Sequence, residues 1–144
     1  MSGSKVPWAS LAKSAERVRG RAHAPYSHYR VGAALLTTGG VVTGCNVENA
    51  SYPLCICAEG AAVARAVAMG RRRWRALAVA TPGPEPGAPC GACRQILAEF
   101  APPTLPIALV VDGVVVRRTT LGELLPLAFS GKTLDGSVKE PEPT

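Results

Sequence analysis

Three cysteines and one glutamate have the types and spacing of a metal site with an acid–base group beside it. Cys57 precedes Glu59 by two residues, and Cys90 and Cys93 lie three residues apart. Residues three apart share one side of a helical turn, so the Cys90 and Cys93 sulfurs can bind the same ion. Helix N-termini favour anions and lower thiol pKa values, which suits thiolate ligands at the starts of two helices. If both helices point at one spot, Cys57 supplies a third sulfur.

A site with three protein ligands is typical of a catalytic zinc ion, which keeps its fourth position open. Water bound to such an ion has a pKa of roughly 7, and a carboxyl group beside it can move protons. We therefore expect Cys57, Cys90 and Cys93 to bind Zn²⁺ and Glu59 to act as the general acid and base.

The alternative is a closed structural zinc site, in which Cys45 or Cys55 supplies a fourth sulfur. Such a site has no use for Glu59, and ribbon-type sites usually take their ligands as two C-x-x-C pairs on turns. The spacing therefore favours the catalytic interpretation over the structural one.

Three segments of the chain resemble the small cytidine deaminases, in the same order along the sequence. They are APYSHYRVGAAL from residue 24, GCNVENASYPLCICAE from residue 44 and APCGACRQIL from residue 88. The resemblance extends over about residues 24–129. It implies a Cys₃ zinc site on Cys57, Cys90 and Cys93, with Glu59 moving protons from water to the ring N3 and the leaving amine. The implied activity is hydrolytic deamination of cytidine and deoxycytidine to uridine and deoxyuridine, with release of ammonia.

The resemblance also implies residues that bind the nucleoside substrate. Asn46 and Glu48 match the family's contacts to ribose hydroxyls, and two residues two apart on a strand face one side. Tyr29 stands where the family has a phenylalanine packing near the substrate, and Ala58 belongs to the same pocket. Phe129 lies near the C-terminal aromatic residue that the family contributes across a subunit interface. Outside the matching segments, each of these would be an ordinary turn, strand or core residue.

One position departs from the family pattern. The family usually reads C-A-E-R, whereas Gly60 follows Glu59 here. In the Cys₃ enzymes that arginine hydrogen-bonds the ligand sulfurs and withdraws their negative charge. We expect helix dipoles and Arg94 to compensate, and Gly60→Arg to raise the deamination rate. Deaminases of nucleoside antibiotics such as blasticidin S also lack the arginine, so a modified cytosine nucleoside is the alternative substrate.

The elements that must position these residues follow from the hydrophobic pattern and the turn residues. The pattern predicts helices and strands in the order α-β-β-α-β-α-β-β-α. This order indicates an α/β fold with a five-stranded mixed sheet in a three-layer α/β/α sandwich, as in cytidine deaminases. We expect one domain over residues 1–134 and a disordered tail over residues 135–144. The predicted helices are 7–22, 57–69, 90–100 and 121–129, the last interrupted or ended near Pro126, and the strands are 31–38, 41–49, 76–83, 106–113 and 114–120.

Composition limits the partners and the location. The 144 residues carry 16 Lys and Arg against 10 Asp and Glu, and four arginines cluster at Arg71, Arg72, Arg73 and Arg75. We interpret this cluster as a solvated loop at a helix end. The alternative from another class of protein is a non-catalytic zinc protein that binds nucleic acid through it. His23 and His28 are expected at the surface.

No run approaches the roughly 18 apolar residues of a membrane span, and the first residues have no apolar signal-peptide core, so we expect a cytoplasmic protein. Aromatic residues make up only 5% of the chain, so its core consists mainly of small side chains. Such a core mildly favours burial between subunits. Together with the resemblance, this predicts a homotetramer, with a dimer as the alternative, acting on a small-molecule nucleoside.

Overall fold

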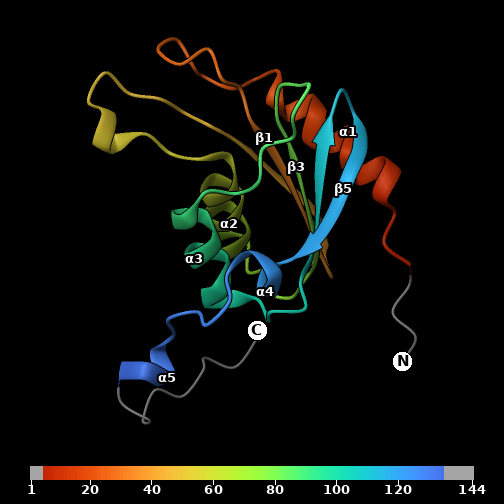
Figure 1. The fold of residues 1–144 in the computed structure, drawn as a ribbon, viewed down its shortest axis with the longest axis vertical. Helices are drawn as coiled ribbons and strands as arrows, with labels where there is room; N and C mark the ends of the chain where they lie inside the picture. The colour runs from red at the N-terminus through yellow and green to blue at the C-terminus, as the bar shows by residue number, and fades with distance from the viewer. Residues whose placement is uncertain (1–4, 135–144) are drawn as a thin grey trace.

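A computed structural model of the chain describes residues 5–134 and contains one mixed five-stranded sheet (Figure 1). The strand order across the sheet is β2-β1-β3-β4-β5. β3 and β4 are parallel, and the other neighbouring pairs are antiparallel. The strands are β1 (Gly32–Thr37), β2 (Gly40–Cys45), β3 (Trp74–Ala80), β4 (Pro106–Val111) and β5 (Val114–Thr120).

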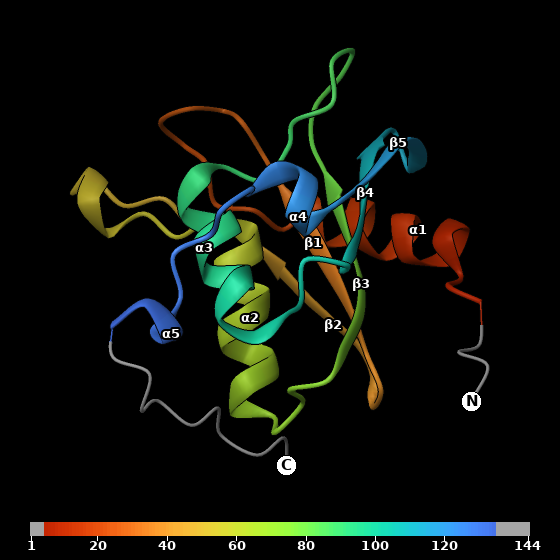
Figure 2. The same cartoon turned by 60° about the horizontal axis from the view of Figure 1, so that its bottom comes forward.

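Helices cover both faces of the sheet. One face carries α1 (Trp8–Arg19), and the other carries α2 (Ala58–Ala68) and α3 (Gly91–Phe100), which lie side by side (Figures 1 and 2). Each face has its own buried apolar cluster, one under α1 and one under α2 and α3. The predicted three-layer α/β/α sandwich with a five-stranded mixed sheet is confirmed.

Small residues allow the helices to approach the sheet closely. A methyl group added at Gly44 of β2 would lie 2.4 Å from the backbone nitrogen of Ala62 and 2.6 Å from the carbonyl oxygen of Ala58. The first turns of α2 therefore rest directly on the backbone of β2, which a larger residue at position 44 would prevent. This contact sets the position of the α2 N-terminus, where Cys57 and Glu59 lie.

Most elements lie within three residues of the predicted boundaries, and two boundaries differ by more. β2 ends at Cys45 rather than at residue 49, because the chain then leaves the ladder and Val47 forms only isolated bridges. The predicted helix over 121–129 is wrong in length, since α4 spans only Leu121–Leu124. Pro126 disfavours helical backbone at the residue before it, so ending the helix near that proline was correct.

Two short elements were not predicted. A 3₁₀ turn, η1 (Tyr52–Leu54), lies in the loop between β2 and α2, and α5 (Gly131–Leu134) ends the described part of the chain. The expected disordered tail, residues 135–144, lies outside the described residues. Within residues 5–134, every helix is too short or too polar to cross a membrane.

Candidate metal centre and adjoining pocket

The N-terminal ends of α2 and α3 bring three cysteines together. Cys57 is the residue that caps α2, Cys90 caps α3, and Cys93 lies in the first turn of α3. Their three Sγ atoms all lie within 4.8 Å of one another. The helices begin one residue later than predicted, yet the predicted convergence of the three sulfurs is what the structure contains.

The sulfur cluster fits a zinc ion. Tetrahedral Zn²⁺ with Zn–S bonds of about 2.3 Å separates its sulfurs by roughly 3.8 Å, within the 4.8 Å observed. Thiolates are also the preferred donors of zinc among the metals common in proteins. Within the described residues the cluster contains only these three side chains, so a tetrahedral ion held here would keep one position for a further ligand.

Cys45 and Cys55 lie outside this cluster. Cys55 is engaged with Asn49, whose backbone N–H donates to the Cys55 Sγ at 3.3 Å. Cys45 is the last residue of β2. A closed site of four sulfurs therefore has no support from the arrangement of the described cysteines.

The protein environment shifts the thiol pKa values in opposite directions. Desolvation by burial raises the pKa of Cys93 and of Cys57, and the Glu59 carboxylate adds to both shifts. The backbone N–H of Cys93 lowers the pKa of Cys90, as expected where amides point out of a helix N-terminus. Cys57 and Cys93, whose pKa values are raised, must therefore give up protons when a metal binds at neutral pH.

Glu59 is a buried carboxyl group next to the sulfurs. Its side chain is 5% exposed, and the Cys93 thiol donates to its Oε2 at 3.5 Å. Burial raises the pKa of Glu59, because a charged carboxylate is poorly solvated there. A raised pKa favours the protonated form of the carboxyl group, which helps Glu59 to hold a proton as a general acid and base does.

A pocket of about 320 Å³ opens in front of this cluster. This size falls within the range of about 300–1,000 Å³ that is usual for small-molecule sites. The cluster side of the pocket is formed by Cys57, Cys90 and Glu59, and four further residues expected at the substrate also line it: Tyr29, Asn46, Glu48 and Ala58.

Asn46 and Glu48 hold the loop between α1 and β1 as well as lining the pocket. The Asn46 amide accepts from the Val31 N–H at 2.8 Å and donates to the Tyr29 carbonyl at 2.8 Å. The Glu48 carboxylate accepts from the backbone N–H of Tyr26 at 3.0 Å. The two side chains were expected to share one face of a strand. That expectation is wrong, because β2 has ended before them, and these loop contacts place them in the pocket instead.

Sequence reasoning missed seven lining residues, which are Ser27, Val31, Cys55, Ile56, Thr81, Gly87 and Ala88. Ser27 lies in the loop held by Glu48, and Thr81 and Gly87 lie after β3. The Gly87 N–H donates to the Thr81 hydroxyl at 2.8 Å, and a methyl group at Gly87 would lie 2.7 Å from the Tyr29 hydroxyl oxygen. Ser27 could have been found from its place within the matching APYSHY segment, whereas no local signal marks Thr81 or Gly87.

Gly60 and Arg94 lie near the cluster on α2 and α3. A Cβ atom at Gly60 would meet only Ile96 Cδ1, at 3.7 Å, so a side chain has space there. The Arg94 guanidinium donates to the carbonyl oxygens of Pro89 and Leu124, both at 2.7 Å. These hydrogen bonds connect Pro89, the residue before Cys90, to the end of α4. Arg94 therefore helps to hold the chain that leads into Cys90 in position.

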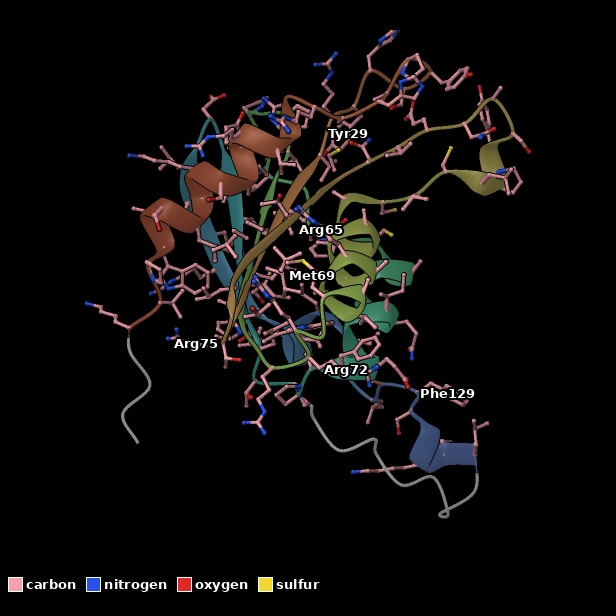
Figure 3. All side chains as sticks on the ribbon, turned by 180° about the vertical axis from the view of Figure 1, so that it is seen from behind. Tyr29, Arg65, Met69, Arg72, Arg75 and Phe129 are labelled. Atoms are coloured by element: carbon pink, nitrogen blue, oxygen red, sulfur yellow. The ribbon has the colours of Figure 1, made fainter. Side chains whose placement is uncertain are left out.

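Phe129 is absent from the lining of this pocket. It is 55% exposed and borders a different hollow beyond the C-terminal end of α3. Figure 3 shows Phe129 and Tyr29 well apart, so one chain does not bring both to a single pocket.

The arginine cluster lies only partly in the predicted solvated loop at a helix end. Arg71, Arg72 and Arg73 lie between α2 and β3, whereas Arg75 belongs to β3. α2 ends at Ala68, and Gly70, with a φ of +72°, turns the chain toward β3. The side chain of Arg71 packs beside Gly39 in the β1–β2 turn. His23 and His28 are exposed, as expected. None of these residues lines the pocket.

Comparison with known proteins gives consistent matches. The family model described as the cytidine and deoxycytidylate deaminase zinc-binding region matches residues 8–109. A cytidine deaminase of Sporosarcina psychrophila is 40% identical over 131 residues, which cover 90% of this chain and 96% of that protein. The crystal structure of a cytidine deaminase from Burkholderia pseudomallei superimposes with a TM-score of 0.79 at 50% identity, covering 83% of this chain and 97% of that one. A blasticidin-S deaminase of Bacillus cereus is 30% identical over 111 residues, 71% of this chain and 78% of that protein.

We predict one zinc ion per chain, lost when any of Cys57, Cys90 or Cys93 is replaced by serine. Because two of these thiols have raised pKa values, zinc binding at neutral pH should release protons, and zinc affinity should fall as the pH is lowered. Metal analysis of the purified variants measures the stoichiometry, and calorimetry in buffers of different ionisation enthalpy measures the protons released.

The matched controls for this prediction are Cys45→Ser and Cys55→Ser, which should keep the full zinc content. Loss of zinc from either control would mean that a fourth sulfur closes the site.

Proposed function

The chain belongs to the cytidine and deoxycytidylate deaminase family and is a zinc-dependent deaminase, and we propose that it hydrolyses cytidine and deoxycytidine to uridine and deoxyuridine, releasing ammonia. The observation that carries this proposal is the buried carboxyl group of Glu59 beside three convergent sulfurs, in a pocket that the polar side chains of Asn46 and Glu48 also line.

Cys57, Cys90 and Cys93 would hold the zinc ion in this reaction. When bound, zinc supplies a water molecule activated for attack on the ring carbon that carries the amine. The Glu59 carboxylate takes one proton from the attacking water and delivers it to ring N3. It then takes the second proton, from the hydroxyl added at the ring carbon, and delivers it to the amine as the bond between that carbon and the amine breaks and ammonia leaves. Its burial supports both transfers, because the raised pKa allows the carboxyl group to be protonated and deprotonated in turn.

The opposite side of the pocket would bind the sugar. Asn46 offers both a donor and an acceptor, and the Glu48 carboxylate accepts hydrogen bonds, so together they suit sugar hydroxyls. Hydrogen bonds to the carboxylate lower the pKa of Glu48, with the Ser27 hydroxyl as the largest cause, so it stays an ionised acceptor at neutral pH. The ring of Tyr29 and the first residue of α2, Ala58, would pack against the base and sugar.

A second candidate is deamination of a modified cytosine nucleoside such as blasticidin S. The observation in its favour is the similarity to the Bacillus cereus protein, together with Gly60 in the C-A-E-G sequence. Both candidates use the same metal and carboxyl group, so they differ only in what the sugar side of the pocket accepts.

We propose a cytoplasmic location and a place in pyrimidine salvage. Three thiols must remain reduced to bind zinc, and the reducing cytosol keeps them so.

Replacing Glu59 by alanine should abolish deamination while leaving the zinc content unchanged. A general acid and base typically contributes about 100- to 10,000-fold to a rate, so a loss of at least that size is expected. The measurement is the ultraviolet absorbance change of cytidine, deoxycytidine and blasticidin S with the purified protein and the variant. Near-native turnover by Glu59→Ala would contradict the mechanism, and turnover of blasticidin S alone would favour the second candidate.

Introducing the family's arginine, Gly60→Arg, should raise kcat and zinc retention. Three thiolates of charge −1 around Zn²⁺ leave a net charge of −1, and a guanidinium beside the sulfurs would offset it. Residues that hydrogen-bond metal ligands change activity or affinity by about 10- to 100-fold when lost, so a gain of up to about 10-fold is expected. Space for the side chain exists, because only Ile96 approaches position 60.

The matched control is Gly60→Ala, which fills the same position without charge and should leave kcat unchanged. An arginine variant no better than the alanine variant in both rate and zinc retention would contradict the charge argument.

We propose that the chain assembles with copies of itself as a homotetramer, with a dimer as the alternative, and that Phe129 completes a neighbour's pocket. The segment around η1 projects from the body of the molecule (Figures 1 and 2) and exposes Tyr52, Leu54 and Ile56 by 68%, 62% and 51%. Apolar groups so exposed on a projecting segment are typical of an interface. Phe129 is exposed and remote from the pocket of its own chain, which a role in another chain's pocket explains.

Subunit mixing tests this assembly. Phe129→Ala alone should lower activity several-fold and Glu59→Ala should abolish it, since each removes one part of every pocket. Co-expressed with different tags, the two variants should recover activity, because some pockets then combine Glu59 of one chain with Phe129 of another. Light scattering after size-exclusion chromatography measures the mass, and a monomeric mass or no recovery in a mixed oligomer would contradict the proposal.

A further inference from the structure

We propose that the Ser27 hydroxyl is a positioning group for the substrate's sugar, because it fixes the Glu48 carboxylate and the backbone of Tyr29 relative to one another. This inference rests on the proposed nucleoside deaminase function. Ser27 lines the pocket together with Glu48 and Tyr29, and its hydroxyl lies between them. It makes a short hydrogen bond to Glu48 Oε2 and accepts one from the Tyr29 N–H at 3.0 Å.

The hydrogen bonds to Glu48 leave one direction for a substrate group. A carboxylate offers about four acceptor positions. Oε1 accepts from the backbone N–H groups of Tyr26 and Ser27, at 3.0 and 3.1 Å, and Oε2 accepts from the Ser27 hydroxyl. The remaining position is on Oε2, so the Ser27 hydroxyl decides where an incoming sugar hydroxyl can be bound.

The orientation of the hydroxyl couples the sugar contact to the aromatic wall of the pocket. A serine hydroxyl has one hydrogen to donate and lone pairs to accept. Donation to Glu48 turns its lone pairs toward the Tyr29 N–H, and His28, with a φ of +57°, forms the left-handed bend that brings this N–H within reach. One hydroxyl therefore orients the Glu48 oxygen that would accept from the sugar, and it also fixes the backbone nitrogen of Tyr29, whose ring is expected to pack near the base.

The loop has other anchors that do not involve this hydroxyl. Asn46 binds the Tyr29 carbonyl and the Val31 N–H, and two backbone N–H groups remain on Glu48 Oε1. Ser27→Ala should therefore keep the fold of the loop, since Asn46 still holds the Tyr29 carbonyl, and its main effect should be on the position of Glu48 Oε2. This separation makes the role of the hydroxyl measurable.

The test compares Ser27→Ala with the unaltered zinc-loaded protein on cytidine and on 2′,3′-dideoxycytidine. On cytidine, KM should rise about 10-fold with kcat little changed, since a hydrogen bond to a charged group is lost far from the reacting carbon. On the dideoxy substrate, which lacks the hydroxyls that Glu48 would bind, kcat/KM of the two proteins should agree within about twofold. Ser27→Thr, which keeps a hydroxyl, should preserve the KM for cytidine.

Ser10→Ala is the matched control. Ser10 lies on α1, on the face of the sheet opposite α2 and α3, and its hydroxyl donates a local hydrogen bond to the Pro7 carbonyl. It should leave both substrates unaffected, and thermal unfolding of all variants should remain within a few degrees of one another.

Three outcomes would overturn the positioning role alone: an unchanged KM for cytidine, an equal loss on both substrates, or a loss confined to kcat. Absence of cytidine turnover by the unaltered protein would instead overturn the proposed function, and with it the inference about Ser27. The two failures are therefore distinguishable in one set of assays.

Discussion

The convergence of two helix N-termini on one point is the constraint on which the rest of the site depends. Cys57 and Cys90 cap α2 and α3, so their sulfurs meet only because both helices lie on the same face of the sheet with their N-termini together. The close contact of α2 with β2 at Gly44 fixes one of these helices, and the hydrogen bonds of Arg94 to Pro89 and Leu124 brace the other. Small residues in the core thus have a direct consequence for metal binding, because bulkier side chains would separate the sulfurs.

The same convergence concentrates negative charge in a poorly solvated place. Cys93 and Glu59 are buried, and burial raises the pKa of both groups. The Glu59 carboxylate raises the pKa of the Cys93 thiol further, whereas the hydrogen bond from that thiol lowers the pKa of Glu59. The described hydrogen bonds of the nearby Arg94 side chain go to carbonyl oxygens, so the dipoles of α2 and α3 are the opposing influence that the geometry supplies. This concentration of negative charge favours binding of a divalent cation, which replaces the protons of the three thiols. It also explains why Gly60, in the place of the family's arginine, matters for the chemistry, since no side-chain cation stands at that position.

The parts of the site that could be predicted from the sequence are those specified over a few residues. The i, i+3 spacing of Cys90 and Cys93 and the short separation of Cys57 and Glu59 in sequence hold despite small errors in helix boundaries. The matching segments identified part of the pocket lining, including Tyr29, Asn46 and Glu48. The hydrogen bonds of Asn46 and Glu48, which follow the end of β2, could not be predicted, because their partners lie 15 to 22 positions earlier in the sequence. The end of α4 and its separation from α5 depend on Pro126 and on the left-handed backbone of Leu127. The hydrophobic periodicity of the sequence does not reveal these backbone features.

The dual use of Asn46 and Glu48 has a consequence for how this pocket achieves selectivity. Both side chains are held by the loop between α1 and β1 before any ligand arrives, so their orientation requires little ordering on binding. The arrangement also leaves few unused hydrogen-bonding positions, since most of the Glu48 acceptors and half of the Asn46 amide are occupied by the protein itself. A ligand that lacks a hydroxyl at the one open position leaves a charged oxygen unpaired, whereas a ligand with additional hydroxyls gains nothing from Glu48. Selectivity at the sugar side therefore comes from the rigidity of the loop, while the chemistry on the base comes from the sulfurs and Glu59, and the two ends of the pocket can vary independently.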